Sequence, residues 1–198
     1  MSDHHDSPDA TISARVRTIE SRLEQLGLLD PRELDQAMAA FLSHASVGNG
    51  ARVVARAWVD EGFRKRLLED ANAALPELGL SMSGGIRDQR LKVVPNTDSE
   101  HNVIVCTLCS CYPVALLGPS PTWYKSESYR SRVVREPRAV LHDFGYDVDP
   151  RMHITVWDAN AETRYMVLPQ RPADSAGLGE DELAQLVSRD GMIGVAPV

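Results

Sequence analysis

Cys106, Cys109 and Cys111 lie within one segment of six residues and are the only three cysteines of the chain. An odd number of cysteines, crowded into so short a segment, is a poor framework for disulfide bonds. Thiolates bind soft metal ions and carry redox chemistry, and in a cytoplasmic protein such a cluster is more often a metal or redox site. We therefore expect the chemistry of this chain at residues 106–111, which we call the claw.

The spacing of Cys109 and Cys111 allows the backbone between them to join a metal site. If the amides of Ser110 and Cys111 lose their protons, the segment offers two sulfur and two nitrogen donors that close fused, unstrained chelate rings. Cys106 can fold back as a fifth donor, which leaves a sixth position open, as a catalytic metal requires. Such strong anionic donors suit a small trivalent ion of octahedral preference, Co(III) or Fe(III).

Three other interpretations of the claw remain open at this point. A structural zinc ion would need a fourth ligand, and the nearest histidines in the sequence are His101 and His142. Cys106 and Cys109 have the spacing of a thioredoxin-like redox pair, although no helix start is predicted there to lower a thiol pKa. The three cysteines could also be purely structural.

The elements around the claw follow from hydrophobic periodicity. Apolar residues at spacings of three and four predict helices at residues 11–28, from Pro31 through Leu42, at 51–59, 60–74, 123–135, 137–144 and 181–188. The run Gly48-Asn49-Gly50 is expected to interrupt the helical region. Alternating or β-branched segments predict strands at residues 91–94, 102–105, 152–157 and 163–168, the second of which leads directly into the claw.

These elements predict an α+β fold with a helical N-terminal arm. We expect a disordered tail at residues 1–10, the arm at residues 11–84, and an α+β metal-binding catalytic domain at residues 85–198. The last boundary is placed at Gly84-Gly85, because the predicted elements are all helical before it and include strands after it. The apolar face of the arm needs a surface to cover it, which could be its own domain or a partner subunit, and we expect the partner.

Composition excludes several classes of function. The net charge of −7 argues against binding a nucleic-acid backbone, which calls for a clustered basic surface. No apolar run is long enough to cross a membrane, and the N-terminus has neither the charge nor the apolar stretch of a signal peptide. We therefore expect a cytoplasmic protein that binds neither nucleic acid nor membrane.

The segment Val105-Cys106-Thr107-Leu108-Cys109-Ser110-Cys111-Tyr112-Pro113 resembles the metal-binding signature of the nitrile hydratase α subunit. The resemblance extends from about residue 50 to the end and includes residues 122–126, 129–138, 156–158, 164–169 and 192–196. It implies a layered α-β-β-α domain with an extended helical arm. In that family threonine after the first cysteine accompanies cobalt, so Thr107 implies a cobalt-type enzyme with one Co(III) per chain.

The resemblance also implies roles for the claw residues and for partners. Cys106, Cys109, Ser110 and Cys111 would hold the metal, with Cys109 oxidised to a sulfinate and Cys111 to a sulfenate, and these two cysteines would be catalytic. Arginines of a β subunit would bind the oxidised sulfurs, a metallochaperone or activator would load cobalt, and a small-molecule nitrile would be the substrate. The resemblance extends to a further γ-type subunit in some relatives.

The expected substrate pocket departs from the family pattern at one position. We expect Thr107, Tyr112, Val114 and Trp123 to line it, and Val114 stands where the family usually has tryptophan. A smaller side chain would widen the pocket for a bulky heteroaromatic nitrile, as in the three-subunit toyocamycin nitrile hydratase, unless the partner repacks the space.

Two alternative functions use the same claw. The related γ subunit of thiocyanate hydrolase carries a cobalt claw and hydrolyses thiocyanate, and the claw does not separate the two activities. The chain could also be a non-catalytic cobalt carrier or regulatory metal-binding module.

Overall fold

The structure is a computed structural model that describes residues 8–82, 89–109 and 111–198. It divides into two compact units, Met1–Phe41 and Leu42–Val198. Residues 1–7 of the predicted tail and the predicted boundary at Gly84-Gly85 lie outside the described residues, whereas residues 8–10 already belong to the first helix. The division at Phe41 therefore falls inside the segment that was predicted as a single arm of residues 11–84.

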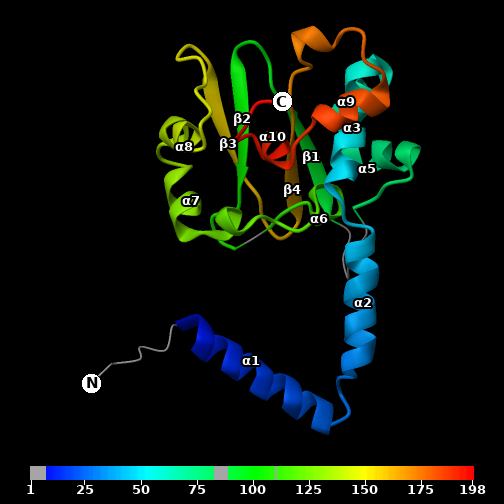
Figure 1. Cartoon of the computed structure of the whole chain (residues 1–198), viewed down its shortest axis with the longest axis vertical. Coiled ribbons are helices and arrows are strands. Elements are labelled where there is room, and N and C mark those ends of the chain that lie inside the picture. The colour runs from blue at the N-terminus through cyan, green and yellow to red at the C-terminus, as the bar shows by residue number, and fades with distance from the viewer. Residues whose placement is uncertain (1–7, 83–88, 110) are drawn as a thin grey trace. The chain divides into compact units, whose positions relative to one another are not determined.

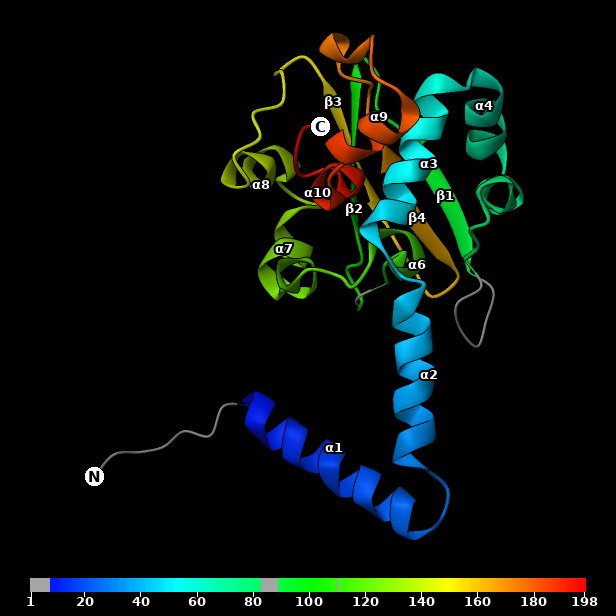
Figure 2. The ribbon, with the colours of Figure 1, turned by 45° about the vertical axis from the view of Figure 1, so that its right-hand side comes forward.

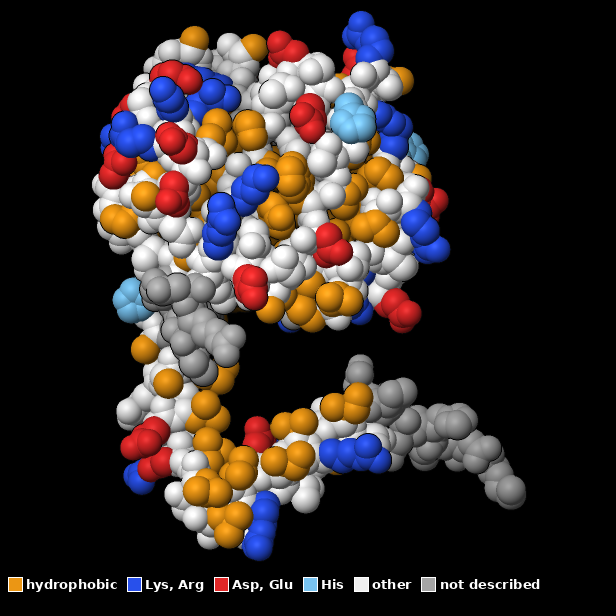
Figure 3. Space-filling model, turned by 180° about the vertical axis from the view of Figure 1, so that it is seen from behind, with side chains coloured by type: hydrophobic (Ala, Val, Ile, Leu, Met, Phe, Trp, Pro, Cys, Tyr) orange, Lys and Arg blue, Asp and Glu red, His pale blue; other side chains and the backbone are white. Residues whose placement is uncertain are grey.

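The first unit contains the helix α1 (Pro8–Gln25) and most of α2 (Pro31–Ser43). Asp30 accepts a hydrogen bond from the Arg32 amide at 2.8 Å, and Pro31 occupies the first helical position, as is common at a helix start. The apolar stripe of α1 is exposed, with Ile12 at 57% and Ile19 at 59%. Figure 3 shows hydrophobic side chains gathered along α1. The periodicity thus predicted the helix correctly, and within the first unit its apolar residues are exposed.

The helix α3 (Val47–Val59) runs through the predicted break at residues 48–50. Ser46 caps it by accepting a hydrogen bond from the Gly48 amide, so the helix starts before the glycines instead of after them. A Cβ on Gly50 would lie 2.8 Å from the carbonyl oxygen of Leu116. Glycine is present here because a neighbouring segment approaches the helix closely, and the predicted break is wrong.

The helix predicted at residues 60–74 is two helices, α4 (Glu61–Glu69) and α5 (Ala71–Ala74), followed by the 3-10 turn η1 (Leu75–Leu78). Asp60 caps α4 through the amide of Phe63, and Asp70 caps α5 through the amide of Ala73. Asp70 has extended backbone angles, and this ends one helix and starts the next.

All four predicted strands are present and form two parallel pairs (Figure 1). Strand β1 (Arg90–Pro95) pairs with β4 (Thr163–Leu168), and β2 (Glu100–Val105) pairs with β3 (His153–Asp158). Parallel strands need long crossover connections. The segment between β2 and β3 supplies one, and the claw and four short helical segments lie within it.

The crossover helices differ from their predictions in detail. They are α6 (Val114–Leu117), the 3-10 turn η2 (Thr122–Lys125), α7 (Glu127–Arg132) and α8 (Pro137–Asp143). The single helix predicted at 123–135 is divided because Ser126 is extended and caps α7 through the amide of Tyr129. The chain closes with η3 (Ala173–Ser175), α9 (Glu180–Leu186) and α10 (Arg189–Ile193). Of these three only α9 was predicted, at residues 181–188, and α6 was not predicted either.

Helices pack around the two strand pairs in the second unit (Figures 1 and 2). Helices α4 and α5 lie on β1, α8 lies on β3, and α10 contacts both β2 and β4. Helix α3 packs against α9 and α6. One hydrophobic core of buried residues extends from α3 to Val195. The α+β prediction is confirmed, and the described helices include none that is long and apolar enough to span a bilayer.

Candidate metal centre

The claw begins where β2 ends, at the carboxyl edge of the parallel pair β2–β3. The register sets Val105 opposite Asp158, and the Ala159 amide donates to the Val105 carbonyl at 2.7 Å. Cys106 therefore leaves a strand whose last residue is fixed by hydrogen bonds. Carboxyl edges of parallel strands are common places for ligand sites, because the chain can diverge there without breaking the sheet.

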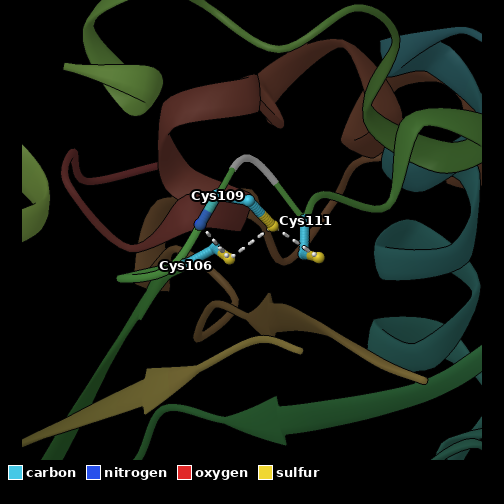
Figure 4. A group of neighbouring side chains, drawn as sticks. All are labelled: Cys106, Cys109 and Cys111. Carbon is cyan, nitrogen blue, oxygen red and sulfur yellow. Dashed lines mark hydrogen bonds between the residues drawn. The ribbon is translucent and has the colours of Figure 1, made fainter. Parts of the chain in front are cut away.

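The three sulfur atoms converge on one point (Figure 4). The Cys106 and Cys109 sulfurs are 3.4 Å apart, those of Cys109 and Cys111 are 3.2 Å apart, and all three lie within 4.8 Å of one another. Two sulfurs that bind one metal at about 2.3 Å are about 3.3 Å apart at a right angle and about 3.8 Å apart at the tetrahedral angle. The two contacts therefore fit adjacent corners of an octahedron better than those of a tetrahedron.

Burial differs among the three sulfur donors. Cys106 is fully buried, Cys111 is partly buried and Cys109 is exposed. Burial raises the pKa of the Cys111 thiol to about 12, assisted by the hydrogen bond to Cys109 and opposed by the positive charge of Arg164. A metal that binds Cys111 must displace this proton, so metal binding is coupled to pH and releases protons.

Polar side chains from two other elements hold Thr107. Asp158 accepts hydrogen bonds from the Thr107 amide at 2.9 Å and from the Thr107 hydroxyl at 2.6 Å. Arg130, on α7, donates to the Thr107 carbonyl at 3.2 Å. The residue after the first cysteine is therefore fixed at its amide, its carbonyl and its side chain.

A group of aromatic side chains lies against the other end of the claw. Tyr124 is fully buried and its hydroxyl donates to the Cys111 carbonyl at 3.0 Å. Its ring meets the Tyr112 ring edge-on at 5.1 Å between centroids. Burial raises the pKa of Tyr124, so its hydroxyl stays protonated at neutral pH and remains a donor.

The predicted pocket residues lie in different environments. Thr107 is part of the claw and Val114 starts α6, where it packs on the core. Tyr112 is buried behind the claw, and Trp123 packs against Phe144 with ring centroids 4.7 Å apart. Their role as a substrate wall stays a prediction. The predicted metal ligand Ser110 lies outside the described residues.

The histidines considered for a zinc site are occupied elsewhere. His101 is buried, and its Nε2 is hydrogen-bonded to the Gly194 carbonyl at 2.7 Å. His142 is exposed and pairs with Asp147 at 2.7 Å. Among the described residues the three cysteines are the one group placed to share a metal ion, so no histidine of the described part of the chain joins them.

Sequence reasoning assigned no role to Asp158, Arg130 and Arg164. Arg164 is 8% exposed, and its charge acts on the Cys111 sulfur. Among the described residues, the buried Nε atoms of Arg130 and Arg164 have no hydrogen-bond acceptor. The signal that could have found Asp158 is its position, since a carboxylate at the end of a predicted strand can meet the residues just beyond the neighbouring parallel strand.

The family model and similar curated proteins point to the same family. The family model for the nitrile hydratase α chain matches residues 10–196. The low-molecular-weight cobalt-containing nitrile hydratase α subunit of Rhodococcus rhodochrous is 47% identical over 185 residues, or 93% of this chain and 88% of the relative. The cobalt-containing α subunit of Pseudonocardia thermophila is 48% identical over 187 residues, or 94% and 90%. The thiocyanate hydrolase γ subunit of Thiobacillus thioparus is 43% identical over 154 residues, or 74% and 63%.

Solved structures agree with these sequence relatives. A double mutant of the Fe-type nitrile hydratase from Comamonas testosteroni Ni1 has a TM-score of 0.87 at 38% identity, covering 96% of this chain and 92% of that chain. A recombinant thiocyanate hydrolase with partially modified cobalt centres has a TM-score of 0.84 at 35% identity, covering 96% and 89%.

Proposed function

This chain belongs to the nitrile hydratase α-chain family, and we propose that it is the α subunit of a cobalt-dependent nitrile hydratase that converts a nitrile to its amide. The observation that carries the proposal is the convergence of the three claw sulfurs, two of whose separations, 3.4 and 3.2 Å, suit adjacent corners of an octahedral ion. The cobalt-containing relatives and Thr107 favour cobalt over iron.

The donor set of the claw fits one low-spin Co(III) ion per chain. Cys106, Cys109 and Cys111 would supply sulfur, and the deprotonated amides of Ser110 and Cys111 would supply nitrogen, because these anionic donors are strong enough for a trivalent ion. When bound, cobalt would supply Lewis-acid chemistry that polarises the carbon–nitrogen triple bond of a nitrile.

The last two cysteines of the claw, Cys109 and Cys111, carry the chemistry of this proposal. Cys109 would be a sulfinate and Cys111 a sulfenate, the oxidation products expected of thiolates held beside an oxidising centre. The Cys111 sulfenate oxygen would form a bond to the nitrile carbon, or would accept a proton from a water molecule that does so. Both routes consume one water molecule, whose two hydrogens reach the amide nitrogen. In direct attack the sulfenate oxygen enters the amide and the water oxygen restores the sulfenate. In the other route the water oxygen itself enters the amide.

The oxidised sulfurs require cationic partners. Arg164 lies close enough for its charge to act on Cys111, and its unpaired Nε is a donor available in this chain. We propose that a β subunit supplies further arginines, because Cys109 is exposed and open to a second chain. The exposed apolar stripe of α1 is proposed as a separate surface for contact with a partner subunit. A metallochaperone for cobalt, a further γ-type subunit and a cytoplasmic location remain predictions.

Val114 and the sequence relatives bear on the choice of substrate. Val114 replaces the tryptophan usual in the family, and this favours a wider pocket and a bulky nitrile, as in the toyocamycin enzyme. The second candidate is a thiocyanate hydrolase-type subunit, favoured by the 43% identity to a γ subunit. A non-catalytic cobalt carrier would use the same donors.

One preparation tests all three candidates. The chain is co-expressed with a nitrile hydratase β subunit and cobalt, and metal content, the mass of the residue 106–111 peptide and turnover of aromatic nitriles and of thiocyanate are measured. The proposal predicts about one cobalt per chain, two added oxygens on Cys109, one on Cys111, and amide formation. Zinc in place of cobalt would overturn the metal site. Cobalt with thiocyanate turnover alone would favour the second candidate, and cobalt without any turnover would favour the carrier.

A further inference from the structure

The two ends of the claw are held by different means. At the N-terminal end, Val105 is fixed by strand pairing, and Thr107 is fixed by Asp158 and Arg130. At the C-terminal end, the chain leaves Cys111 and turns into the short helix α6 without strand pairing. Among the described contacts, the hydrogen bond from Tyr124 is the one that a side chain makes to the backbone of Cys111.

The surroundings of the Tyr124 hydroxyl favour its hydrogen bond to the Cys111 carbonyl. The side chain is fully buried, and its ring is surrounded by those of Tyr112, Trp123 and Tyr129 at centroid distances of 5.1, 6.0 and 5.8 Å. A buried hydroxyl that loses its acceptor loses a hydrogen bond that water cannot replace. Movement of the Cys111 carbonyl would therefore leave the hydroxyl unpaired inside an aromatic cluster.

We propose that Tyr124 is a positioning residue that fixes Cys111, the last residue of the claw, through its carbonyl, so that the Cys111 nitrogen and sulfur are presented together to the metal. This inference rests on the proposed function. The carbonyl, the amide nitrogen and the side chain of Cys111 share one α-carbon, so fixing the carbonyl plane restricts how the nitrogen and sulfur turn toward the ion. Ligands that are orientated in advance bind more tightly, because less freedom is lost on binding.

The matched control is Tyr129. Its hydroxyl is also buried and donates to a backbone carbonyl, that of Ile104 at 2.7 Å, but this carbonyl lies within β2 and not in the claw. Tyr124→Phe and Tyr129→Phe each remove one buried phenol–carbonyl hydrogen bond and keep the ring. A purely structural role would therefore affect both variants equally, whereas a positioning role separates them.

Two measurements on the full-length chain test the inference. Amide hydrogen exchange over residues 106–112 is followed in the metal-free protein, and Co(II) is titrated anaerobically while the sulfur-to-cobalt charge-transfer absorption is recorded. Tyr124→Phe should exchange faster in this segment and bind Co(II) roughly threefold to tenfold more weakly, with a shifted charge-transfer band. Tyr129→Phe should match the wild type in both measurements, although both variants lose thermal stability.

The outcomes separate this inference from the proposed function. Equal behaviour of the wild type and Tyr124→Phe in exchange and in Co(II) affinity overturns the inference alone. Equal weakening by Tyr124→Phe and Tyr129→Phe also overturns it, because general loosening would then account for the result. A wild-type chain that gives no sulfur-to-cobalt band overturns the proposed function, and the exchange data on the metal-free chain still decide whether Tyr124 orders the claw.

Discussion

The two strand pairs of this protein are alike in form but differ in the residues at which they end. Each consists of two parallel six-residue strands in full register. The pair β1–β4 ends with Pro95 opposite Leu168, and its strand β4 is largely buried. The pair β2–β3 ends with Val105 opposite Asp158, and β3 is half-exposed along most of its length. Both pairs contribute to the core, because β2 is also buried, but the claw follows the pair β2–β3. The difference lies in the residues at the carboxyl edge of each pair.

The largest effect is expected from the first residue beyond β2. Cys106→Ser keeps the volume of the side chain but replaces a soft sulfur donor with a hydroxyl, so cobalt content and activity should both fall to about a hundredth or less. Metal analysis of the purified chain and a nitrile hydration assay check this. Because Cys106 is a buried neighbour of the core, circular dichroism should confirm that the variant is folded; a folded variant with full cobalt content would contradict the assignment.

A large but partial effect is expected at the last residue of β3. Asp158→Ala leaves the amide and hydroxyl of Thr107 without their acceptor, and loss of such a supporting contact should weaken cobalt binding by about 10-fold to 100-fold. The matched control is Asp98→Ala. Asp98 is a carboxylate three residues beyond the end of β1, on the β1–β4 side, where it accepts a hydrogen bond from Gln170 at 2.7 Å. If the two variants bound cobalt equally well, the two strand pairs would not differ as described.

An intermediate effect on stability is expected where α10 meets β2. Gly194 has φ +91°, and a Cβ there would lie 2.0 Å from the Asn102 carbonyl oxygen. Gly194→Ala should lower the free energy of unfolding by roughly 3 to 5 kcal/mol, the sum of backbone strain and overpacking. Gly79→Ala is the control, since Gly79 has φ +68° with open space around it, and should lose only about 1 kcal/mol. Denaturant unfolding measures the free energy of unfolding of both variants. Similar losses in the two would show that β2 can move away from a Cβ at position 194 at little cost.

The smallest effect is expected on the pH dependence of the unfolding free energy. It again distinguishes the two strand pairs, because β2 carries a buried histidine and neither β1 nor β4 contains one. Burial lowers the pKa of His101, with a further contribution from the charge of Arg138 and opposition from the bond to Gly194. The unfolded chain therefore takes up a proton near pH 6.5 while the folded chain does not, so stability is retained above that pH and lost as the pH falls below it.

His101→Gln should remove part of this dependence. The difference in unfolding free energy between pH 7.5 and pH 5.5 should be smaller in the variant than in the wild type. His142 is the control because it is exposed and its pKa is raised by the hydrogen bond to Asp147. Its contribution has the opposite sign, present at low pH and lost as pH rises, so His142→Gln should not reduce the acid sensitivity. If the unfolding free energy of His101→Gln changed with pH as steeply as that of the wild type, His101 would be excluded as the source of the acid sensitivity.

Much of this architecture could be predicted from the sequence because local patterns determine it. Alternation and β-branched residues located β2 and β3, and the number and spacing of the cysteines located the claw. The break expected at Gly48-Asn49-Gly50 was wrong because the reason for Gly50 lies elsewhere in the chain, at the Leu116 carbonyl. Periodicity describes what one segment prefers, and it holds no information about which other segment approaches it.

The supporting residues of the site were missed for the same reason. Asp158 reaches Thr107 only because β3 pairs with β2 in parallel and in one register. The contact between the Tyr124 hydroxyl and the Cys111 carbonyl could not be predicted from the sequence, because it depends on how the crossover folds back. Ligands that are adjacent in the chain are visible in a sequence, whereas the residues that orientate them come from elsewhere.

The parallel pairing of β2 with β3 also sets an order of events during synthesis. Thr107 and Asp158 are 51 residues apart, so the ribosome adds the carboxylate roughly 3 to 10 s after the threonine. During that interval the three thiols exist without their support and would accept soft cations such as Zn(II) or Cu(I). Under the proposed function, correct metallation requires that cobalt be delivered after β3 has docked, so the choice of metal depends on when the ion arrives as well as on how tightly it binds.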